Sequence, residues 1–247
     1  MTLTDTHVVV TGGGTGVGAA IAHAFAKAGA KVTIMGRTEA SLAEQGLPYA
    51  VCDVTKADTV ASAFDAARRE RGPITIAVAN AGAATSVPFA KMTAADLSAM
   101  TEVNLTGVFN VWQAALRDML DAHEGRMIAI ASTAGLKGYP YVSGYCAAKH
   151  GVVGLTRALG VELAGKGITV NAICPGFVDT PMLERSIANI IDKTGMNRED
   201  AAKSLSKGNP QGRFITTEEV AGAALWLCSD AAKSVNGHAL SLSGGEI

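Results

Sequence analysis

Long apolar runs, paired cysteines and blocks of like charge are all missing from this sequence of 247 residues. No stretch reaches the roughly 18 apolar residues that a membrane-spanning helix needs, so a membrane protein is not expected. The four cysteines, Cys52, Cys146, Cys174 and Cys228, lie far apart and form no CxxC pair. This spacing predicts neither a zinc site nor a disulfide framework, and we expect reduced thiols in or near the core.

Charge and composition exclude further classes of protein. The net charge is −1, which indicates no partner among nucleic acids or anionic lipids. The first residues contain no basic region followed by a long apolar segment, so we expect no signal peptide and a cytoplasmic location. Hydrophobic residues make up 48% of the chain, enough for the core of one large domain over residues 1–247.

Short apolar runs alternate with helical segments along the chain. Strands are predicted at 7–11, 31–35, 49–52, 74–79, 127–131, 169–173 and 239–242. Helices are predicted at 19–28, 56–71, 101–122, 143–164 and 217–227. Continuous apolar strands between helices are typical of a parallel sheet that is covered on both faces. We therefore predict a single α/β domain with a doubly wound sheet of about seven strands.

One polar and mixed segment, residues 179–211, separates the sixth predicted strand from the seventh. A long excursion in a compact domain is often a functional lid or a mobile segment. Its apolar residues recur at roughly helical spacing, and Gly195, Gly208 and Pro210 punctuate it. The pattern predicts an amphipathic lid over a substrate, and the alternative is a rigid pair of surface helices.

Glycines cluster between the first strand and the first helix, in the sequence Thr11-Gly12-Gly13-Gly14-Thr15-Gly16-Val17-Gly18. Glycine lets the backbone turn tightly and approach a phosphate, and the following helix offers free N–H groups at its N-terminus. The alternative is a plain glycine-rich turn. The position at the first β–α junction favours a dinucleotide site.

Tyr145 and Lys149 stand four residues apart in the stretch GYCAAKHG. Residues at this spacing lie one above the other on a helix, so the phenol and the ammonium share one face. The pair alone occurs by chance in many sequences and establishes no catalytic site. Its meaning depends on the rest of the chain.

Taken together, these motifs resemble the short-chain dehydrogenase/reductase family over the whole chain. Thr11–Gly18 matches its cofactor loop, residues 79–82 match its NNAG motif with alanine in the first position, and Pro175-Gly176 matches its PG motif. Its catalytic tetrad is matched by Asn104, Ser132, Tyr145 and Lys149. The resemblance implies a Rossmann fold and an NAD(P)-dependent oxidoreductase that interconverts a secondary alcohol and a ketone.

The resemblance also implies a role for each member of the tetrad. Tyr145 would be the general acid and base, with its ordinary pKa of about 10 lowered by Lys149 and by the oxidised nicotinamide. Lys149 would also bind the nicotinamide ribose, Ser132 would hydrogen-bond the substrate oxygen, and Asn104 would hold a water in a proton relay. Taken singly, Ser132 could simply end a strand and Asn104 could bond locally.

Cofactor contacts are implied at the ends of the strands. Asp53 matches a residue that contacts adenine, and Thr180 matches one that bonds the nicotinamide carboxamide. The expected cofactor-binding set is Gly12, Gly14, Thr15, Gly16, Val17, Gly18, Arg37, Thr38, Asp53, Val54, Asn80, Gly82, Tyr145, Lys149, Pro175, Gly176, Val178 and Thr180. No metal site is expected.

The end of the second strand distinguishes the two nicotinamide cofactors. An acidic residue there would bind the ribose 2′-hydroxyl and repel a 2′-phosphate, but Gly36 occupies this place and Arg37 follows it. A guanidinium is well suited to a phosphate, so NADP(H) is favoured over NAD(H). The alternative is that Arg37 only stacks on adenine.

The substrate is less well defined by the sequence. The second half of the chain resembles 3-oxoacyl reductases and 3-hydroxybutyrate dehydrogenases, yet the polar positions that hold a free carboxylate in the latter are Ala84, Ala134, Val142 and Ser186. Buried anions need paired donors, so a 3-oxoacyl or 3-hydroxyacyl thioester is preferred. The candidate cations for a carrier phosphate are Lys137 and Arg185, and the alternative is that both are solvated surface cations.

Two alternatives and one assembly state are also expected. A bulky cyclic or aromatic ketone is the alternative substrate. A catalytically silent dinucleotide-binding regulator is the alternative of another class, although an intact tetrad argues against it. The resemblance also implies a homotetramer, because members of this family pair the long helices equivalent to 101–122 and 143–164.

Overall fold

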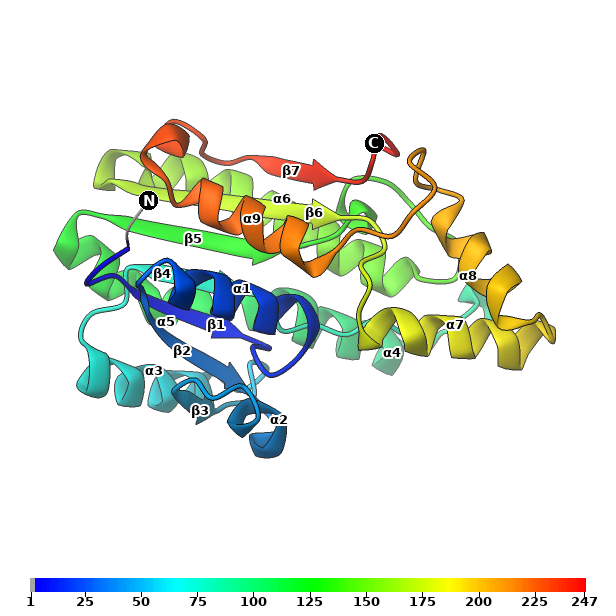
Figure 1. The fold of residues 1–247 in the computed structure, drawn as a ribbon, viewed down its shortest axis with the longest axis horizontal. Coiled ribbons are helices and arrows are strands. Elements are labelled where there is room, and N and C mark those ends of the chain that lie inside the picture. The colour runs from blue at the N-terminus through cyan, green and yellow to red at the C-terminus, as the bar shows by residue number, and fades with distance from the viewer. Residues whose placement is uncertain (1–2) are drawn as a thin grey trace.

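Seven parallel strands form one sheet in the computed structural model, which describes residues 3–247 (Figure 1). The strand order is β3-β2-β1-β4-β5-β6-β7. The strands are β1 (His7–Thr11), β2 (Lys31–Gly36), β3 (Tyr49–Val51), β4 (Ile76–Ala79), β5 (Gly125–Ile130), β6 (Ile168–Pro175) and β7 (Ala239–Leu242). The predicted seven-stranded parallel sheet is confirmed, with strand limits that differ from the prediction by at most two residues.

Helices connect the strands and cover both faces of the sheet. The α-helices are α1 (Gly16–Lys27), α2 (Glu39–Ala43), α3 (Ala57–Arg71), α4 (Ala94–Thr101), α5 (Gly107–Ala122), α6 (Ser143–Leu163), α7 (Pro181–Thr194), α8 (Arg198–Ser206) and α9 (Thr217–Leu227). A π-helical turn, η2 (Glu102–Thr106), joins α4 to α5, and short 3₁₀ turns are η1 (Phe89–Lys91), η3 (Thr133–Gly135), η4 (Ala164–Lys166) and η5 (Asp230–Ala232). None of the helices within residues 3–247 is long and apolar enough to cross a membrane.

Alternation along the strands divides the core into two apolar clusters. Val9 packs with α3, α5 and α6 on one face, whereas Val8 and Val10 pack with α1 and α9 on the other. Figure 1 shows α1 and α9 in front of the sheet. Because successive strand residues point to opposite faces, the continuous apolar runs of the sequence are what a doubly covered sheet requires. All four cysteines are free and buried, as predicted.

One predicted helix is divided in the structure. Residues 101–122 were expected to form a single helix, but α5 begins only at Gly107 and the π-helical turn η2 precedes it. The helix α4 before this turn starts at a capping box in which Thr93 and Asp96 bond each other's backbone N–H groups. π-Helical turns are rare and frequently mark functional sites, and this one contains Asn104.

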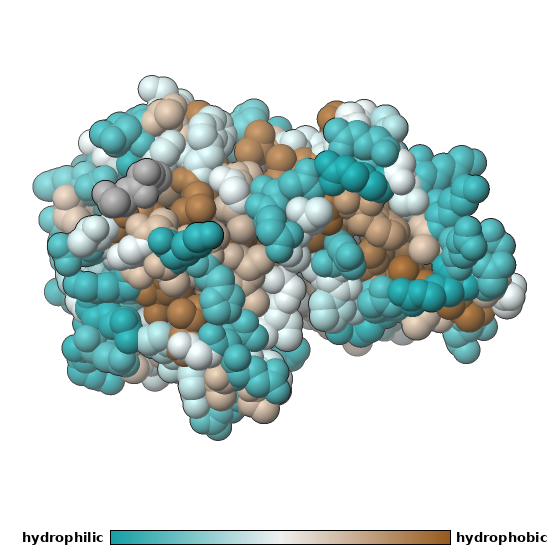
Figure 2. Space-filling view, in the orientation of Figure 1, coloured by the Kyte–Doolittle hydropathy of each residue, from teal (hydrophilic) through white to brown (hydrophobic). Residues whose placement is uncertain are grey.

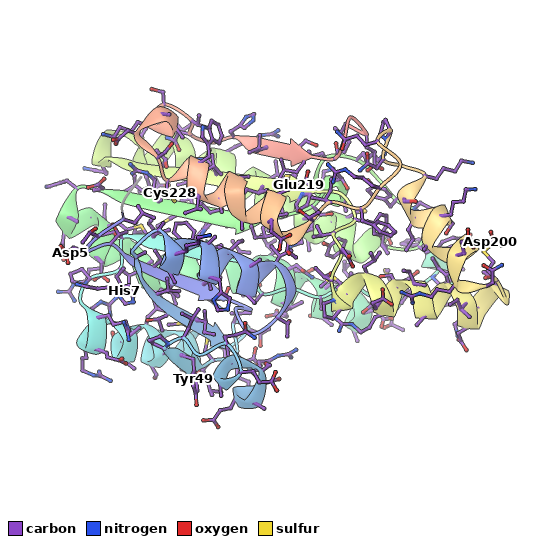
Figure 3. The ribbon with its side chains drawn as sticks, viewed as in Figure 1. Asp5, His7, Tyr49, Asp200, Glu219 and Cys228 are labelled. Atoms are coloured by element: carbon purple, nitrogen blue, oxygen red, sulfur yellow. The ribbon has the colours of Figure 1, made fainter. Side chains whose placement is uncertain are left out.

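The chain reverses its direction of travel across the sheet between β1 and β4. From β1 the chain first adds β2 and then β3 toward one edge of the sheet. It then crosses over to β4, which lies next to β1 on the opposite side. In open α/β sheets, ligands bind in the crevice at the carboxyl ends of the strands at such a switch point. The helices α7 and α8, which include the labelled Asp200, lie at this end of the sheet, and the labelled His7 lies toward the opposite end (Figure 3).

Candidate active site

The predicted site residues gather at the carboxyl edge of the sheet. Thr11 ends β1, Asn80 follows β4, Ser132 lies two residues after β5, and Gly176 follows β6. These strands are neighbours in the order β1-β4-β5-β6. The structure therefore assembles, on one edge, residues from four separate parts of the chain.

The glycine loop is shaped by close backbone contacts. Gly12 and Gly16 have φ angles of +65° and +53°, a left-handed conformation that glycine adopts at low cost. A side chain on Gly18 would collide with the Gly12 carbonyl and the Asn80 amide. The loop therefore holds α1 close to the ends of β1 and β4, an arrangement that only glycine at these positions permits.

The N-terminus of α1 is suited to an anion. Thr15 occupies the cap position, but its side chain accepts no hydrogen bond from the first turn of the helix. The first N–H groups of a helix lack partners within the helix and carry a partial positive charge. The cradle of glycines and the uncapped helix end both fit the pyrophosphate of a dinucleotide.

Asn80 fixes the loop from behind. Its side-chain amide donates to the carbonyl oxygens of Thr11 at 2.9 Å and Gly12 at 3.3 Å. The backbone N–H groups of Asn80 and Ala81 donate to the Thr11 hydroxyl at 3.1 and 3.2 Å. Asn80 is expected among the cofactor contacts, and its amide nitrogen is directed at the backbone of the glycine loop.

The ends of β2 and β3 bring a cation and an anion together. Arg37 is exposed, and Asp53 accepts hydrogen bonds from the backbone N–H and the hydroxyl of Thr55 at 3.0 and 2.9 Å. The Thr55 backbone N–H holds the pKa of Asp53 below its ordinary value, and Arg37 acts in the same direction. The side chain of the adjacent Val54 is buried, and its carbonyl accepts from the Asn110 amide at 2.8 Å.

Tyr145 and Lys149 share one face of α6, as their spacing predicts. The Lys149 ammonium donates to the Ile130 carbonyl at 2.8 Å and lies 5.6 Å from the centre of the Tyr145 ring. Burial lowers the pKa of Lys149 to about 8, and Cys174 partly opposes this shift. Sequence reasoning missed the Ile130 carbonyl, because no sequence signal marks a backbone acceptor on another element.

The acidity of Tyr145 depends mainly on its burial. Burial raises the pKa of Tyr145 to about 12, and the neighbouring Ser132 hydroxyl partly offsets that shift. The expected lowering involves Lys149 together with the oxidised nicotinamide and stays a prediction, whereas burial is the largest influence on the phenol within the protein chain. Tyr145 is therefore a protonated phenol at neutral pH.

Ser132 and Asn104 differ in how far their side chains are engaged. Ser132 accepts a hydrogen bond from the Ala134 backbone N–H at 3.1 Å and is partly exposed. Asn104 is fully buried, and its amide donates to the carbonyls of Ala83 at 2.8 Å and Met100 at 3.0 Å. Its Oδ1 atom accepts from the Ala83 backbone N–H at 3.3 Å, so the side chain ties the segment after β4 to the π-helical turn.

Gly82 lies close to both Asn104 and Lys149. A side chain on Gly82 would lie 2.8 Å from the Asn104 Oδ1 atom and 3.7 Å from the Lys149 ammonium. The structure therefore brings Gly82, Asn104 and Lys149 together.

The turn after β6 borders the glycine loop. Thr180 caps α7 by accepting from the Leu183 backbone N–H at 3.4 Å, and a side chain on Gly16 would lie 3.2 Å from its methyl group. Val178 forms a parallel β-bridge with Ile215. Pro175, Gly176, Val178 and Thr180 thus lie at the same edge as the loop, where the expected cofactor contacts place them.

Lys137 does not extend freely into solvent. Its ammonium pairs with the Glu246 carboxylate at 2.8 Å and lies 5.0 Å above the centre of the Tyr139 ring. Sequence reasoning named Lys137 as a cation for a carrier phosphate and did not single out Glu246 or Tyr139. Of the two candidate cations, only Arg185 is exposed and outside the ion pairs found among residues 3–247.

Comparison with known proteins agrees with this geometry. A family model described as "Enoyl-(Acyl carrier protein) reductase" matches residues 12–246. A granaticin polyketide synthase putative ketoacyl reductase of Streptomyces violaceoruber is 38% identical, over 96% of this chain and 91% of the relative. A 3-oxoacyl-[acyl-carrier-protein] reductase of Chlamydia muridarum is 36% identical over 98% of both chains. The crystal structure of a single-residue variant of actinorhodin polyketide ketoreductase with NADPH superimposes with a TM-score of 0.93, at 35% identity, over 100% of this chain and 99% of the other.

Proposed function

Because the chain belongs to the short-chain dehydrogenase/reductase family, whose members interconvert secondary alcohols and ketones, we propose that it reduces the 3-oxo group of an acyl thioester. The observation that carries this proposal is the set of Ser132, Tyr145 and Lys149 at the edge that also holds the glycine loop. A nicotinamide cofactor supplies the hydride when bound.

The proton chemistry of the site suits reduction. A carbonyl that receives a hydride needs a proton on its oxygen, and a phenol with a pKa of about 12 carries that proton at neutral pH. Ser132, partly exposed beside Tyr145, hydrogen-bonds the carbonyl oxygen and holds it near the phenol. Lys149, with a pKa of about 8, remains mostly protonated at neutral pH and binds the nicotinamide ribose.

NADP(H) is the proposed cofactor. Arg37 is exposed just beyond β2, and Gly36 leaves no carboxylate to repel a 2′-phosphate. The structural relative with NADPH adds support. The glycine cradle, the uncapped α1 terminus and Asp53 fit the remainder of the dinucleotide.

A thioester is favoured by the apolar character of the positions that would otherwise hold a free carboxylate. Ala84, Ala134 and Val142 offer no side-chain donor, and the hydroxyl of the fourth position, Ser186, donates to the Met182 carbonyl at 3.1 Å. Both sequence relatives described above are named as ketoacyl or oxoacyl reductases. Arg185 is the remaining candidate cation for a carrier phosphate, because Lys137 is paired with Glu246.

A bulky cyclic or aromatic ketone is the second candidate. Two aromatic side chains are exposed in the segments that precede α4 and α6, Phe89 at 82% and Tyr141 at 62%. The backbone N–H of Val87 donates to the Tyr141 carbonyl at 2.7 Å, which joins these two segments. Exposed aromatic rings beside the site favour a flat apolar substrate.

One assay separates these candidates. The protein is tested with 3-oxoacyl thioesters, the corresponding free acids and bulky cyclic ketones, each with NADPH and with NADH. The highest kcat/KM is expected for a thioester with NADPH. A preference for cyclic ketones would select the second candidate, and no turnover of any substrate would favour a silent dinucleotide-binding regulator.

We also propose a cytoplasmic homotetramer. The four free thiols are typical of a reducing compartment. Large apolar side chains are exposed on three helices, Phe109 on α5, Val161 on α6 and Trp226 on α9. Static light scattering at micromolar concentration should give four times the 25.2 kDa mass of the chain, and a monomeric mass would refute the proposal.

A further inference from the structure

A charged cluster joins the segment after Ser132 to the segment Ser243–Ile247. The Glu246 side chain is 8% exposed, and its Oε1 atom lies 2.8 Å from both the Lys137 ammonium and the Tyr139 hydroxyl. The Tyr139 hydroxyl lies 2.7 Å from the Thr133 hydroxyl. Nothing in the proton chemistry proposed for the site uses these groups.

The carboxylate determines the direction of the hydrogen bonds. An ionised carboxylate only accepts, so Tyr139 must donate its single hydroxyl proton to Glu246. The Thr133 hydroxyl must then donate to Tyr139. A directed chain therefore runs from Glu246 through Tyr139 to Thr133, the residue next to Ser132.

The turn that begins at Ser132 transmits this constraint. The Gly135 backbone N–H donates to the Ser132 carbonyl at 2.8 Å, and the Lys137 backbone N–H donates to the Thr133 carbonyl at 3.0 Å. Thr133 is 3% exposed. A tight, buried turn moves as a unit, so a change at Tyr139 or Lys137 should displace the Ser132 hydroxyl.

The same carboxylate lies against the end of the α7–α8 excursion. A side chain on Gly208 would lie 2.8 Å from Glu246 Oε1, and one on Gly176 would lie 3.7 Å from Oε2. Gly244 has a φ of +64°, and any side chain there would collide with Asn209. The segment Ser243–Ile247 thus packs directly on the turn that follows α8.

We propose that Glu246 is a positioning residue, which holds Ser132 through Tyr139 and Thr133 and fixes the turn after α8 in the same contact. This inference rests on the proposed role of Ser132. A buried ion pair is weak evidence for stability, because desolvation offsets much of the attraction. The role proposed for Glu246 therefore concerns the reaction rather than stability, because Glu246 lies between the turn that begins at Ser132 and the α7–α8 excursion.

The test is a double-mutant cycle measured by ketone reduction with NADPH. Glu246→Ala is expected to lower kcat by about 10–100-fold, as small misplacements of a catalytic group do, with the Kd for NADPH unchanged within about twofold. In a Ser132→Ala background, Glu246→Ala should cause no further loss. Glu246→Gln keeps an acceptor for Tyr139 and should retain more activity than Glu246→Ala.

A matched control comes from an ion pair outside the site. Asp230→Asn removes an exposed pair of the same 2.8 Å length and should leave kcat unchanged. If the losses from Glu246→Ala and Ser132→Ala multiply, or if Glu246→Ala keeps kcat within about twofold of wild type, the proposal is wrong. If Glu246→Ala does not fold, Tyr139→Phe replaces it in the double-mutant cycle with Ser132→Ala. This variant removes the hydroxyl that links Glu246 to Thr133 but keeps the aromatic ring.

Hydrogen exchange separates this inference from the proposed function. Full activity of Ser132→Ala would overturn the catalytic role of Ser132. In that case faster exchange of residues 133–139 together with 206–212 in Glu246→Ala would still support the contact. Unchanged exchange in both segments would overturn it.

Discussion

The ammonium of Lys149 lies 5.6 Å from the centre of the Tyr145 ring and is held there by the Ile130 carbonyl at 2.8 Å. Within about 6 Å, a cation over an aromatic face is attracted by the ring itself. Lys149 therefore depends on the ring of Tyr145 and on the backbone of β5, but not on the phenolic oxygen. Removing the hydroxyl should leave the lysine in place.

Tyr145→Phe should lower kcat for ketone reduction by about 10²–10⁴-fold, the usual contribution of a general acid. The Kd for NADPH, measured by fluorescence titration, should stay within about twofold, because Lys149 keeps its position. Tyr49→Phe is the matched control, since Tyr49 is exposed on β3 and lies outside the segments proposed to meet the substrate. A variant at position 145 that kept more than about a tenth of the wild-type kcat would show that another group is the acid.

Arg37→Asp should move the cofactor preference from NADPH toward NADH. The substitution removes a cation suited to the 2′-phosphate and adds a carboxylate that repels it and can accept from a ribose hydroxyl. The ratio of kcat/KM for the two cofactors should change by about tenfold or more, equivalent to about 1.4 kcal/mol. Arg69→Asp, an exposed change of the same charge on α3, should not move the ratio. A wild-type protein that already prefers NADH would contradict the assignment.

Gly18→Ala tests the cradle independently of the reaction. The added methyl group would collide with the Gly12 carbonyl and the Asn80 amide, which would push α1 away from the ends of the strands. The Kd for NADPH should rise by about tenfold or more, equivalent to about 1.4 kcal/mol of binding free energy. Gly165→Ala serves as the control, because no atom lies within 4 Å of the added methyl group. Equal affinity in both variants would mean that the loop does not hold the cofactor.

Much of this site could be predicted because it depends on local spacing. The glycine loop, the Tyr145–Lys149 pair and the apolar strands all leave periodic signals within a few residues of one another. The contact between Tyr139 and Glu246 joins residues 107 positions apart, and no local pattern marks it. The π-helical turn at Asn104 was missed for another reason: its residues have the same helical composition as their neighbours, and only packing against Ala83 and Met100 reveals the turn.

The environment of Tyr145 could not be predicted from its motif, because burial depends on the whole fold. The spacing places an ammonium near a phenol, which alone lowers the pKa of the phenol. The surrounding core is assembled from α6, β5 and β6, and the desolvation that it causes raises the pKa of the phenol more than the Ser132 hydroxyl lowers it. The motif predicted the partners of Tyr145 but not its environment.

Stability should fall as the pH drops below the ordinary histidine value. His7 is buried, with Nδ1 2.8 Å from the Gly72 carbonyl and Nε2 2.9 Å from the Thr33 hydroxyl. Burial lowers the pKa of His7 in the folded state. Below about pH 6.5 the unfolded chain takes up a proton that the folded protein does not, so the free energy of unfolding decreases by up to about 1.4 kcal/mol per pH unit. Above pH 6.5 this contribution is fully present.

Denaturant titrations at pH 7.5 and 5.5 measure this dependence. His7→Asn keeps a donor near the Gly72 carbonyl but removes the titrating ring, so the difference between the two pH values should shrink. Figure 3 places His7 at the end of the sheet away from α7 and α8, so cofactor affinity should be unaffected. An unchanged pH dependence in the variant would assign the effect to other groups.

The α7–α8 pair, we propose, closes over the substrate. The pair has its own apolar cluster around Leu183, Ile187 and Ala201, separate from the two clusters of the sheet. Arg198 and Glu184 join the two helices through contacts of 2.7 Å. In Figure 2 this end of the molecule carries an apolar surface bordered by hydrophilic residues.

The two ends of the excursion lie side by side, and this limits how the pair can move. Asp179 and Ile215 are joined by a backbone hydrogen bond of 3.0 Å, and Val178 pairs with Ile215 in a parallel bridge. The pair should therefore close as one body about this bridge. Its helices are already formed, so closure rather than folding is expected to change their exposure. A rigid surface pair with no such motion is the alternative.

Hydrogen exchange of residues 179–211 distinguishes the two. With NADP⁺ and a substrate analogue bound, exchange in this segment should slow, most clearly between α7 and α8 and in the turn after α8, where the backbone is least bonded. The helix α3, which packs against α5 and β3, serves as the internal reference. It should exchange at the same rate with and without the ligands. If residues 179–211 are equally protected with and without the ligands, the pair is rigid and water must be excluded from the carbonyl by other residues.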